Sequence, residues 1–181
     1  MNSNNLDGEI KSSISNFGLT PYGHSIIGNL WIEEGNENGC KKFTIDIDGT
    51  GDPDTEPSPI VLVERGGCSF VSKVRNIEHA GGRLALIIDN TDEDINNVIM
   101  VDDGQGNGIR IPSMLITEKE GTILKNELLD KKTRIALMAT FEMDRPDNRV
   151  EYDFWYTSSD DRALDFLRDF EENHLQFKKD V

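Results

Sequence analysis

One stretch whose residue types could carry out chemistry is ERGGCSFVSKVRN, residues 64–76. It places Cys68 directly after Gly66 and Gly67, at the start of a helical pattern. Backbone N–H groups at a helix N-terminus favour a thiolate, which would make this cysteine a nucleophile. The alternative is a disulfide with Cys40, the other cysteine of the chain, which would close a loop of about 28 residues. The residues alone leave both interpretations open.

A second candidate is DIDGT, residues 46–50, which has the form of the haloacid-dehalogenase-type phosphatase motif. That chemistry would make Asp46 the nucleophile, give Asp48 the proton of the leaving group, and hold Mg²⁺ between carboxylates. The two lysines before the motif and the Gly- and Pro-rich run after it do not suit such a site. A strand that runs into an acidic loop is the simpler interpretation.

The sequence gives weaker support for a metal site or a phosphate-binding site. Two cysteines cannot form a four-thiolate zinc site, and His24, His79 and His174 show no ligand spacing relative to them. The glycine-rich GQGNG (104–108) leads into a strand instead of a helix, which favours a surface loop over a phosphate cradle. We therefore expect neither a metal nor a cofactor.

The net charge of the chain limits the classes of partner that it can bind. The formal net charge is -15, with 34 acidic against 19 basic residues among 181. Nucleic acids and anionic membranes require a basic surface, so we expect neither nucleic acid binding nor direct membrane contact. The polar start MNSNNLDGEIKSS has no apolar core of a signal peptide, and no apolar run approaches the roughly 18 residues of a membrane span.

Periodicity predicts the elements that position these residues. Residues 1–16 are rich in Asn and Ser and are expected to form a loose arm. Ser69 is the expected N-cap of one helix, and Thr117 with Glu120 has the form of a capping box for another. Strands are predicted at 25–34, 41–47, 59–65, 83–89, 109–117 and 133–143. This order indicates a mixed α/β domain, followed by a linker at 144–149, a strand at 150–156 and a helix at about 160–175.

The central stretch resembles a protease-associated (PA) domain. The motif of that family is a buried strand, then Arg-Gly-x-Cys-x-Phe, then a helix with a Lys and a C-terminal Ala-Gly. IVLVERGGCSFVSKVRNIEHAGG contains each of these, and LALIIDN and IRIPSMLITEKEGTILKNEL resemble the strands and helix that follow. The matching residues of the motif are Arg65, Gly66, Cys68, Phe70, Lys73, Ala80 and Gly81. The resemblance covers residues 17–143.

This resemblance implies an α/β (α+β) fold, with a curved β-sheet or open-barrel body flanked by two helices and a C-terminal strand–helix extension. It implies a disulfide between Cys40 and Cys68 and a non-catalytic module that binds peptide or protein cargo. Arg65 would be the main polar contact, and Gly66, Gly67 and Ser69 would offer backbone or hydroxyl groups.

The C-terminal stretch DNRVEYDFWYTSSDDRALDFLRDFEENHLQF resembles the segment that follows the PA domain in vacuolar sorting receptors. The plant receptors carry cysteines here, and this sequence has none. The resemblance implies the luminal part of a single-pass receptor that recognises sorting signals for vacuolar or lysosomal delivery. The alternatives are a recruitment module of a transmembrane RING ubiquitin ligase or of a protease, and a Mg-dependent phosphatase using Asp46 and Asp48.

Overall fold

A computed structural model describes residues 8–44, 58–129, 134–142 and 161–173 of the chain. The chain divides into two compact units, residues 1–142 and 143–181. The second unit contains helix α3 (Asp161–Asn173), at the position of the helix predicted for residues 160–175. The strand predicted at 150–156 lies outside the described residues.

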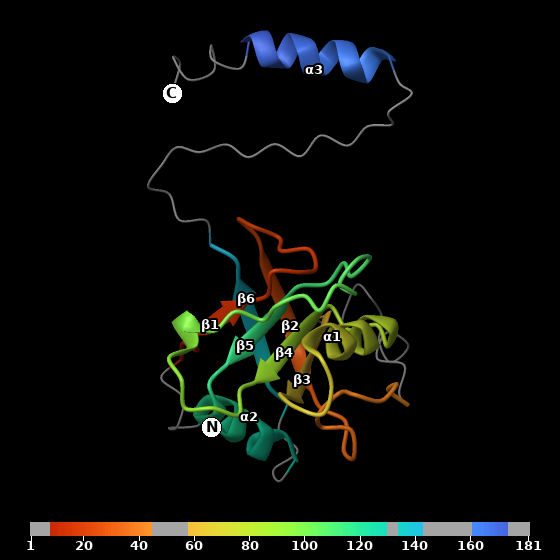
Figure 1. Cartoon of the computed structure of the whole chain (residues 1–181). Helices are drawn as coiled ribbons and strands as arrows, with labels where there is room; N and C mark the ends of the chain where they lie inside the picture. The colour runs from red at the N-terminus through yellow and green to blue at the C-terminus, as the bar shows by residue number, and fades with distance from the viewer. Residues whose placement is uncertain (1–7, 45–57, 130–133, 143–160, 174–181) are drawn as a thin grey trace. The chain divides into compact units, whose positions relative to one another are not determined.

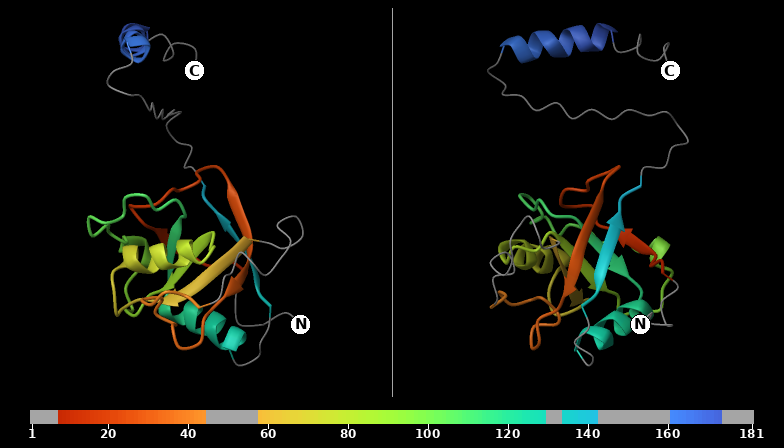
Figure 2. Two further views of the ribbon diagram at one scale, coloured as in Figure 1. Left: turned by 90° about the vertical axis from the view of Figure 1, so that its right-hand side faces the viewer. Right: turned by 180° about the vertical axis from the view of Figure 1, so that it is seen from behind.

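The body of the first unit is a six-stranded sheet that curls into an open barrel, seen from three sides in Figures 1 and 2. Its strand order is β1-β5-β4-β3-β2-β6. The four central strands run parallel, and β1 and β6 pair antiparallel at the two edges. The elements are β1 (Ser12–Ile14), β2 (Ser25–Trp31), β3 (Ser58–Glu64), α1 (Phe70–His79), β4 (Leu84–Ile88), η2 (Ile95–Asn97), β5 (Ser113–Ile116), α2 (Glu118–Leu129) and β6 (Ala136–Thr140). The expected fold class is confirmed.

Strand β3 shows how the two faces of the sheet are covered. Val61 and Val63 belong to a buried cluster with the apolar side of α1, whereas Ile60 and Leu62 belong to a second cluster with Leu124 of α2. All four β3 side chains are fully buried. A parallel strand buried on both faces reads as a continuous apolar run, which is why PIVLV, residues 59–63, is apolar throughout.

The two helices begin where their caps predict. The Ser69 hydroxyl accepts a hydrogen bond from the Ser72 N–H at 3.2 Å and caps α1. The Glu120 N–H donates to the Thr117 hydroxyl oxygen at 3.3 Å, and that hydroxyl donates to the Glu120 carboxylate at 2.7 Å. Helix α1 therefore begins after the five-residue loop 65–69 that follows β3, and α2 begins two residues after the end of β5.

The expectation that residues 1–16 form a loose arm is wrong for their C-terminal part. Ser12–Ile14 form β1, which pairs with β5, and Ser15 forms a bridge with Met100. The Ser15 hydroxyl donates to Phe17 O at 2.7 Å. Short polar strands of this kind are stabilised by their long-range partners, so the local sequence does not reveal them.

Several predicted strands are shorter than expected, and two of them show why. Residues 41–44 form no strand, because the side chains of Asn36 and Glu33 bond the backbone of Lys41 and Thr44 in place of a neighbouring strand. The rest of the strand predicted at 41–47 lies outside the described residues. β5 begins only at Ser113, since the N–H groups before it bond elsewhere, as that of Arg110 does to the Glu78 carboxylate at 2.8 Å.

Helix α2 packs closely on β4 at Gly121, and we expect Gly121→Ala to destabilise the domain. A methyl group there would lie 2.3 Å from Ile88 Cγ2, so the side chain or the helix must shift. Overpacking of this kind costs about 1–3 kcal/mol, and the gain in helix propensity offsets only part of it. Urea unfolding measures the change, with Thr122→Ala on the exposed side of α2 as the control. A Gly121→Ala variant at least as stable as the parent protein would contradict this packing.

Candidate functional site

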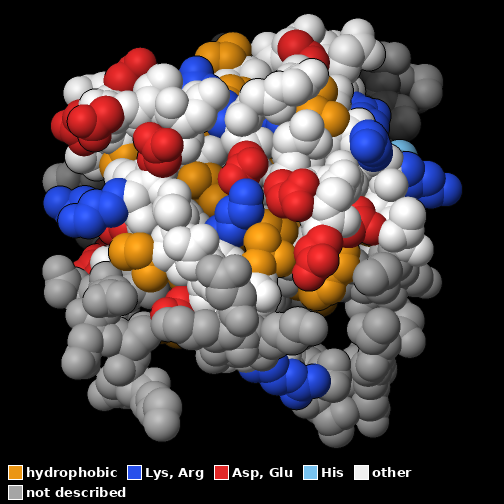
Figure 3. Space-filling view, turned by 90° about the horizontal axis from the view of Figure 1, so that it is seen from below, with side chains coloured by type: hydrophobic (Ala, Val, Ile, Leu, Met, Phe, Trp, Pro, Cys, Tyr) orange, Lys and Arg blue, Asp and Glu red, His pale blue; other side chains and the backbone are white. Residues whose placement is uncertain are grey.

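The sequence motif 65–69 lies at the carboxyl end of β3, where the loop enters α1. Parallel strands end at the same edge of a sheet, so the loops that follow β2 and β4 lie beside it. Figure 3 views the molecule from this edge and shows charged side chains of both signs around exposed apolar ones. In open α/β sheets, ligands bind at the carboxyl ends of the strands, and the loop 65–69 occupies that position.

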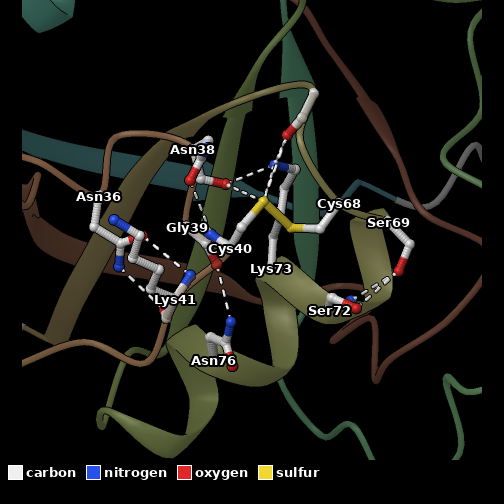
Figure 4. Close-up of a disulfide and its surroundings, with 11 residues drawn as sticks. Asn36, Asn38, Gly39, Cys40, Lys41, Cys68, Ser69, Ser72, Lys73 and Asn76 are labelled. Carbon is white, nitrogen blue, oxygen red and sulfur yellow. Dashed lines mark hydrogen bonds between the residues drawn. A yellow bond between two sulfur atoms is a disulfide. The ribbon is translucent and has the colours of Figure 1, made fainter.

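A disulfide joins two of these loops (Figure 4). Cys40, in the loop after β2, is bonded to Cys68, directly before the N-cap of α1, and the S–S distance is 2.07 Å. No cysteine of the chain is free. The structure therefore contains no thiol that could act as a nucleophile, and it contains the pair that the resemblance implies.

Lys73 lies beside the disulfide with its side chain fully buried. Its ammonium donates to Asn38 O at 2.6 Å, donates to Gly66 O, and lies 3.4 Å from Cys40 Sγ. Burial lowers the pKa of Lys73 to about 8, against the opposing charge of Glu64, which raises it. One buried cation therefore ties the loop after β2 to the loop after β3.

Arg65 is held by a buried carboxylate. Its Nη1 lies 2.7 Å from Oδ1 of Asp89, and the exposed fractions of the two side chains are 31% and 1%. Its guanidinium also lies over the Phe70 ring, 5.6 Å from the centroid. The guanidinium is thus fixed on one side by an ion pair, and the Arg65 side chain remains partly exposed to solvent.

Asp89 stays ionised although it is buried. Burial raises the pKa of Asp89, but the hydrogen bonds from Arg65, the Asn90 N–H and the Thr91 hydroxyl outweigh this effect and lower it overall. The pairing follows from the sheet register, because Glu64 is opposite Ile88 and the next residues along each strand are Arg65 and Asp89.

The two glycines of the motif have backbone angles that favour glycine. Gly66 has φ 108° and Gly67 has φ 81°. A methyl group on Gly67 would lie 3.0 Å from Asn38 Nδ2 and 3.1 Å from Cys40 Sγ. The loop can therefore lie against the disulfide only with no side chain at this position.

Ser69, expected to offer its hydroxyl to cargo, uses that hydroxyl inside the fold. Besides capping α1, it lies 3.0 Å from the Ser72 hydroxyl. It also hydrogen-bonds the carboxylate of Asp103, which lowers the pKa of that exposed aspartate. Asp46 and Asp48, the residues of the phosphatase alternative, lie outside the described residues.

Sequence reasoning did not assign Asp89, Asn38 or the buried position of Lys73 to this site. Asp89 had a recognisable signal, because it ends the apolar run LALIID on the strand next to β3. Lys73 follows Phe70 by three residues and precedes Ile77 by four, so it lies on the buried stripe of α1. Asn38 had no such signal, since its position depends on the disulfide.

Among the described residues, no group of three or more His, Cys, Asp or Glu side chains is placed to hold a metal ion. No helix in the described part of the chain is long and apolar enough to cross a membrane. The sequence profile described as PA domain matches residues 26–124. The chain belongs to the PA domain family. Its PA domain includes the disulfide-linked loops, the Arg65 ion pair and helix α1.

Proteins similar to this PA domain chain include receptors. Vacuolar-sorting receptor 1 of Pisum sativum is 32% identical over 177 residues, an alignment that covers 91% of this chain and 28% of the receptor. Receptor homology region, transmembrane domain- and RING domain-containing protein 2 of Arabidopsis thaliana is 31% identical over 139 residues, covering 77% of this chain and 30% of that protein. The chain thus spans less than a third of the length of these relatives.

Among solved structures, an aminopeptidase from Aneurinibacillus sp. strain AM-1 matches part of this chain. It has a TM-score of 0.47 and 20% sequence identity, and the match covers 70% of this chain and 26% of the aminopeptidase.

We expect the Cys40→Ala/Cys68→Ala variant to lose about 3–4 kcal/mol of unfolding free energy, because the bridge closes a loop of 28 residues. Urea unfolding of the two proteins without reductant measures the difference. Thiol titration of the unreduced, denatured parent protein is the control. Two titratable thiols in that control would show that the bridge is absent in solution.

We expect the unfolding free energy to rise with pH between about 8 and 10.5. Burial lowers the pKa of Lys73 from 10.5 to about 8 in the folded protein. In that window the unfolded chain binds a proton that the folded chain has lost, so alkaline pH favours folding. Lys73→Met removes this contribution, and the difference between the two pH profiles isolates it from other titrating groups. Parallel profiles would show that Lys73 has no lowered pKa.

Proposed function

We propose that this chain is a non-catalytic luminal module that binds peptide segments of protein cargo for vacuolar or lysosomal delivery. The observation that carries the proposal is the Arg65 guanidinium, held by the buried Asp89 and exposed over 31% of its side chain beside Gly66 and Gly67. Its fixed, partly exposed N–H groups suit a carboxylate or the carbonyl groups of a peptide.

The geometry favours recognition by binding over catalysis. Both cysteines are in a disulfide, and the cation nearest to it, Lys73, is buried and bonded to backbone carbonyls. The other accessible groups around the loop are the Arg65 guanidinium, the glycine backbone, the amides of Asn38 and Asn90 in neighbouring loops, and the Ser69 hydroxyl, which is engaged in capping α1. These groups bind and orient a ligand, and none of them is a ready nucleophile.

Two further observations support a receptor in the endomembrane lumen. A structural disulfide is typical of an oxidising compartment such as the lumen of the secretory pathway. The pea relative is named a vacuolar-sorting receptor, and the similarity covers 91% of this chain. The full-length protein would then be anchored by a membrane span outside this chain, with this module in the lumen.

A second candidate function is substrate recruitment in a transmembrane RING ubiquitin ligase or a protease. The observation that favours it is the Arabidopsis relative whose name includes a transmembrane and a RING domain, similar over 77% of this chain. The same loop would bind the ligand in either case. The sequence that follows this module in the full-length protein separates the two.

The proposal is tested by calorimetry of a panel of synthetic peptides from the termini of vacuolar enzymes, at neutral and acidic pH. We expect Arg65→Ala to weaken binding by about tenfold or more, since a charge-assisted hydrogen bond contributes about 1.5–3 kcal/mol. Arg65→Lys keeps a positive partner for Asp89 while removing the planar fork, so it separates ligand contact from loss of the ion pair.

Arg110→Ala is the matched control, because it removes one exposed arginine from a different loop. It should bind the peptides like the parent protein. Peptide affinities that are the same for the parent protein, Arg65→Lys and Arg65→Ala would remove Arg65 from the site. A panel in which no peptide binds the parent protein would contradict the proposed function.

A further inference from the structure

Two asparagine side chains flank the glycine pair of the motif from different loops. Asn38 belongs to the loop after β2, and its Nδ2 would lie 3.0 Å from a methyl group placed on Gly67. Asn90 belongs to the loop after β4, and its Nδ2 would lie 3.9 Å from a methyl group placed on Gly66. The absence of side chains on the glycines thus leaves a short stretch of backbone with a carboxamide on each side.

Both carboxamides have donors left over. Within the described part of the chain, the Nδ2 groups of Asn38 and Asn90 donate to no protein acceptor, and both residues are exposed. Two other asparagines of the region differ. Asn36 donates to Glu33 and to a backbone carbonyl, and Asn76 donates to Gly39 O at 3.0 Å.

The backbone of each asparagine is nevertheless fixed. Asn38 O accepts the Lys73 ammonium, and its Oδ1 accepts the Cys40 N–H at 3.1 Å, so the buried lysine and the disulfide loop both hold it (Figure 4). The Asn90 N–H donates to the Asp89 carboxylate at 2.8 Å. The same two ions that order the motif therefore also position its two flanking amides.

We infer that Asn38 and Asn90 are ligand contacts that bind the main chain of an extended peptide lying over Gly66 and Gly67. This inference rests on the proposed function and adds the chemical class of the recognised groups. Asn38 donates to a peptide carbonyl through Nδ2, the group that has no acceptor among the described residues, while its Oδ1 accepts the Cys40 N–H. Asn90 has both groups available, so it donates to a carbonyl and accepts a peptide N–H.

Main-chain recognition has a consequence for specificity. Carbonyl and N–H groups are common to all residues, so these contacts would fix where a peptide lies without selecting its side chains. Arg65 adds a charged contact at one end of the glycine pair. The site would then accept peptides of varied sequence, provided that the segment over the glycines is extended.

The test uses the tightest-binding peptide of the panel described above and the variants Asn38→Asp and Asn90→Asp. Each variant loses the Nδ2 donor but keeps an acceptor oxygen, which in Asn38→Asp preserves the bond from the Cys40 N–H. We expect each to weaken binding about threefold to tenfold, the size of one net hydrogen bond. Asn97→Asp, at an exposed position of η2, adds the same charge and should change affinity less than about twofold.

A second measurement replaces the amides of the peptide, one at a time, by esters, which removes an N–H and weakens a carbonyl acceptor. At least one ester should weaken binding to the parent protein. Where that ester weakens a carbonyl bonded by Asn90 Nδ2, its effect should vanish in Asn90→Asp, which lacks this donor, as expected for groups in direct contact. The scan on the parent protein also decides the matter where a variant fails to fold. Binding unaffected by every ester would overturn the inference.

The outcomes separate the inference from the proposed function. Peptide binding that depends on Arg65 but is unchanged in Asn38→Asp and Asn90→Asp leaves the proposed function standing and rejects the role of the asparagines. A panel in which no peptide binds the parent protein rejects the proposed function itself.

Discussion

The arrangement of the site depends on one buried cation. The Lys73 ammonium has no exposed surface and donates to backbone carbonyls of two loops, Asn38 O after β2 and Gly66 O after β3. Burying an ammonium group is costly unless its donors are satisfied, so the lysine imposes a definite position on both carbonyls. The Cys40–Cys68 disulfide adds a covalent link between the same loops, at the same place. The loops are thus joined twice, once by charge and once by a bond.

A second buried charge orders the opposite side of the motif. Asp89 binds the Arg65 guanidinium, the Asn90 N–H and the Thr91 hydroxyl, which joins the loop after β3 to the loop after β4. Lys73 and Asp89 each hydrogen-bond groups in the loops, which have no partner strand in the sheet. The exposed surface of the motif is therefore formed by groups with little freedom left, and a ligand would lose less entropy in ordering them.

Local sequence predicted the elements whose stability is local. The run PIVLVE, the cap at Ser69 and the capping box at Thr117 each carry their own signal, and β3, α1 and α2 follow from them. Ser12–Ile14 and residues 41–44 were predicted wrongly, because distant partners decide their conformation. The same distinction holds in the site. The motif was visible in the sequence. Its support by Lys73 and Asp89 was not, because it depends on how β2, β3 and β4 pair and so bring their loops together.

The charges that support the motif persist into acidic conditions. Burial raises the pKa of Asp89, but the hydrogen bonds from Arg65, Asn90 and Thr91 outweigh burial and lower this pKa overall, so its carboxylate stays ionised at mildly acidic pH, and Lys73 with a pKa of about 8 becomes more completely protonated. Both ion-dependent links between the loops therefore remain between neutral and mildly acidic pH. A ligand released by acidification would have to lose affinity through its own titrating groups or through residues outside these links, because the framework of the loop does not change its charge over that range.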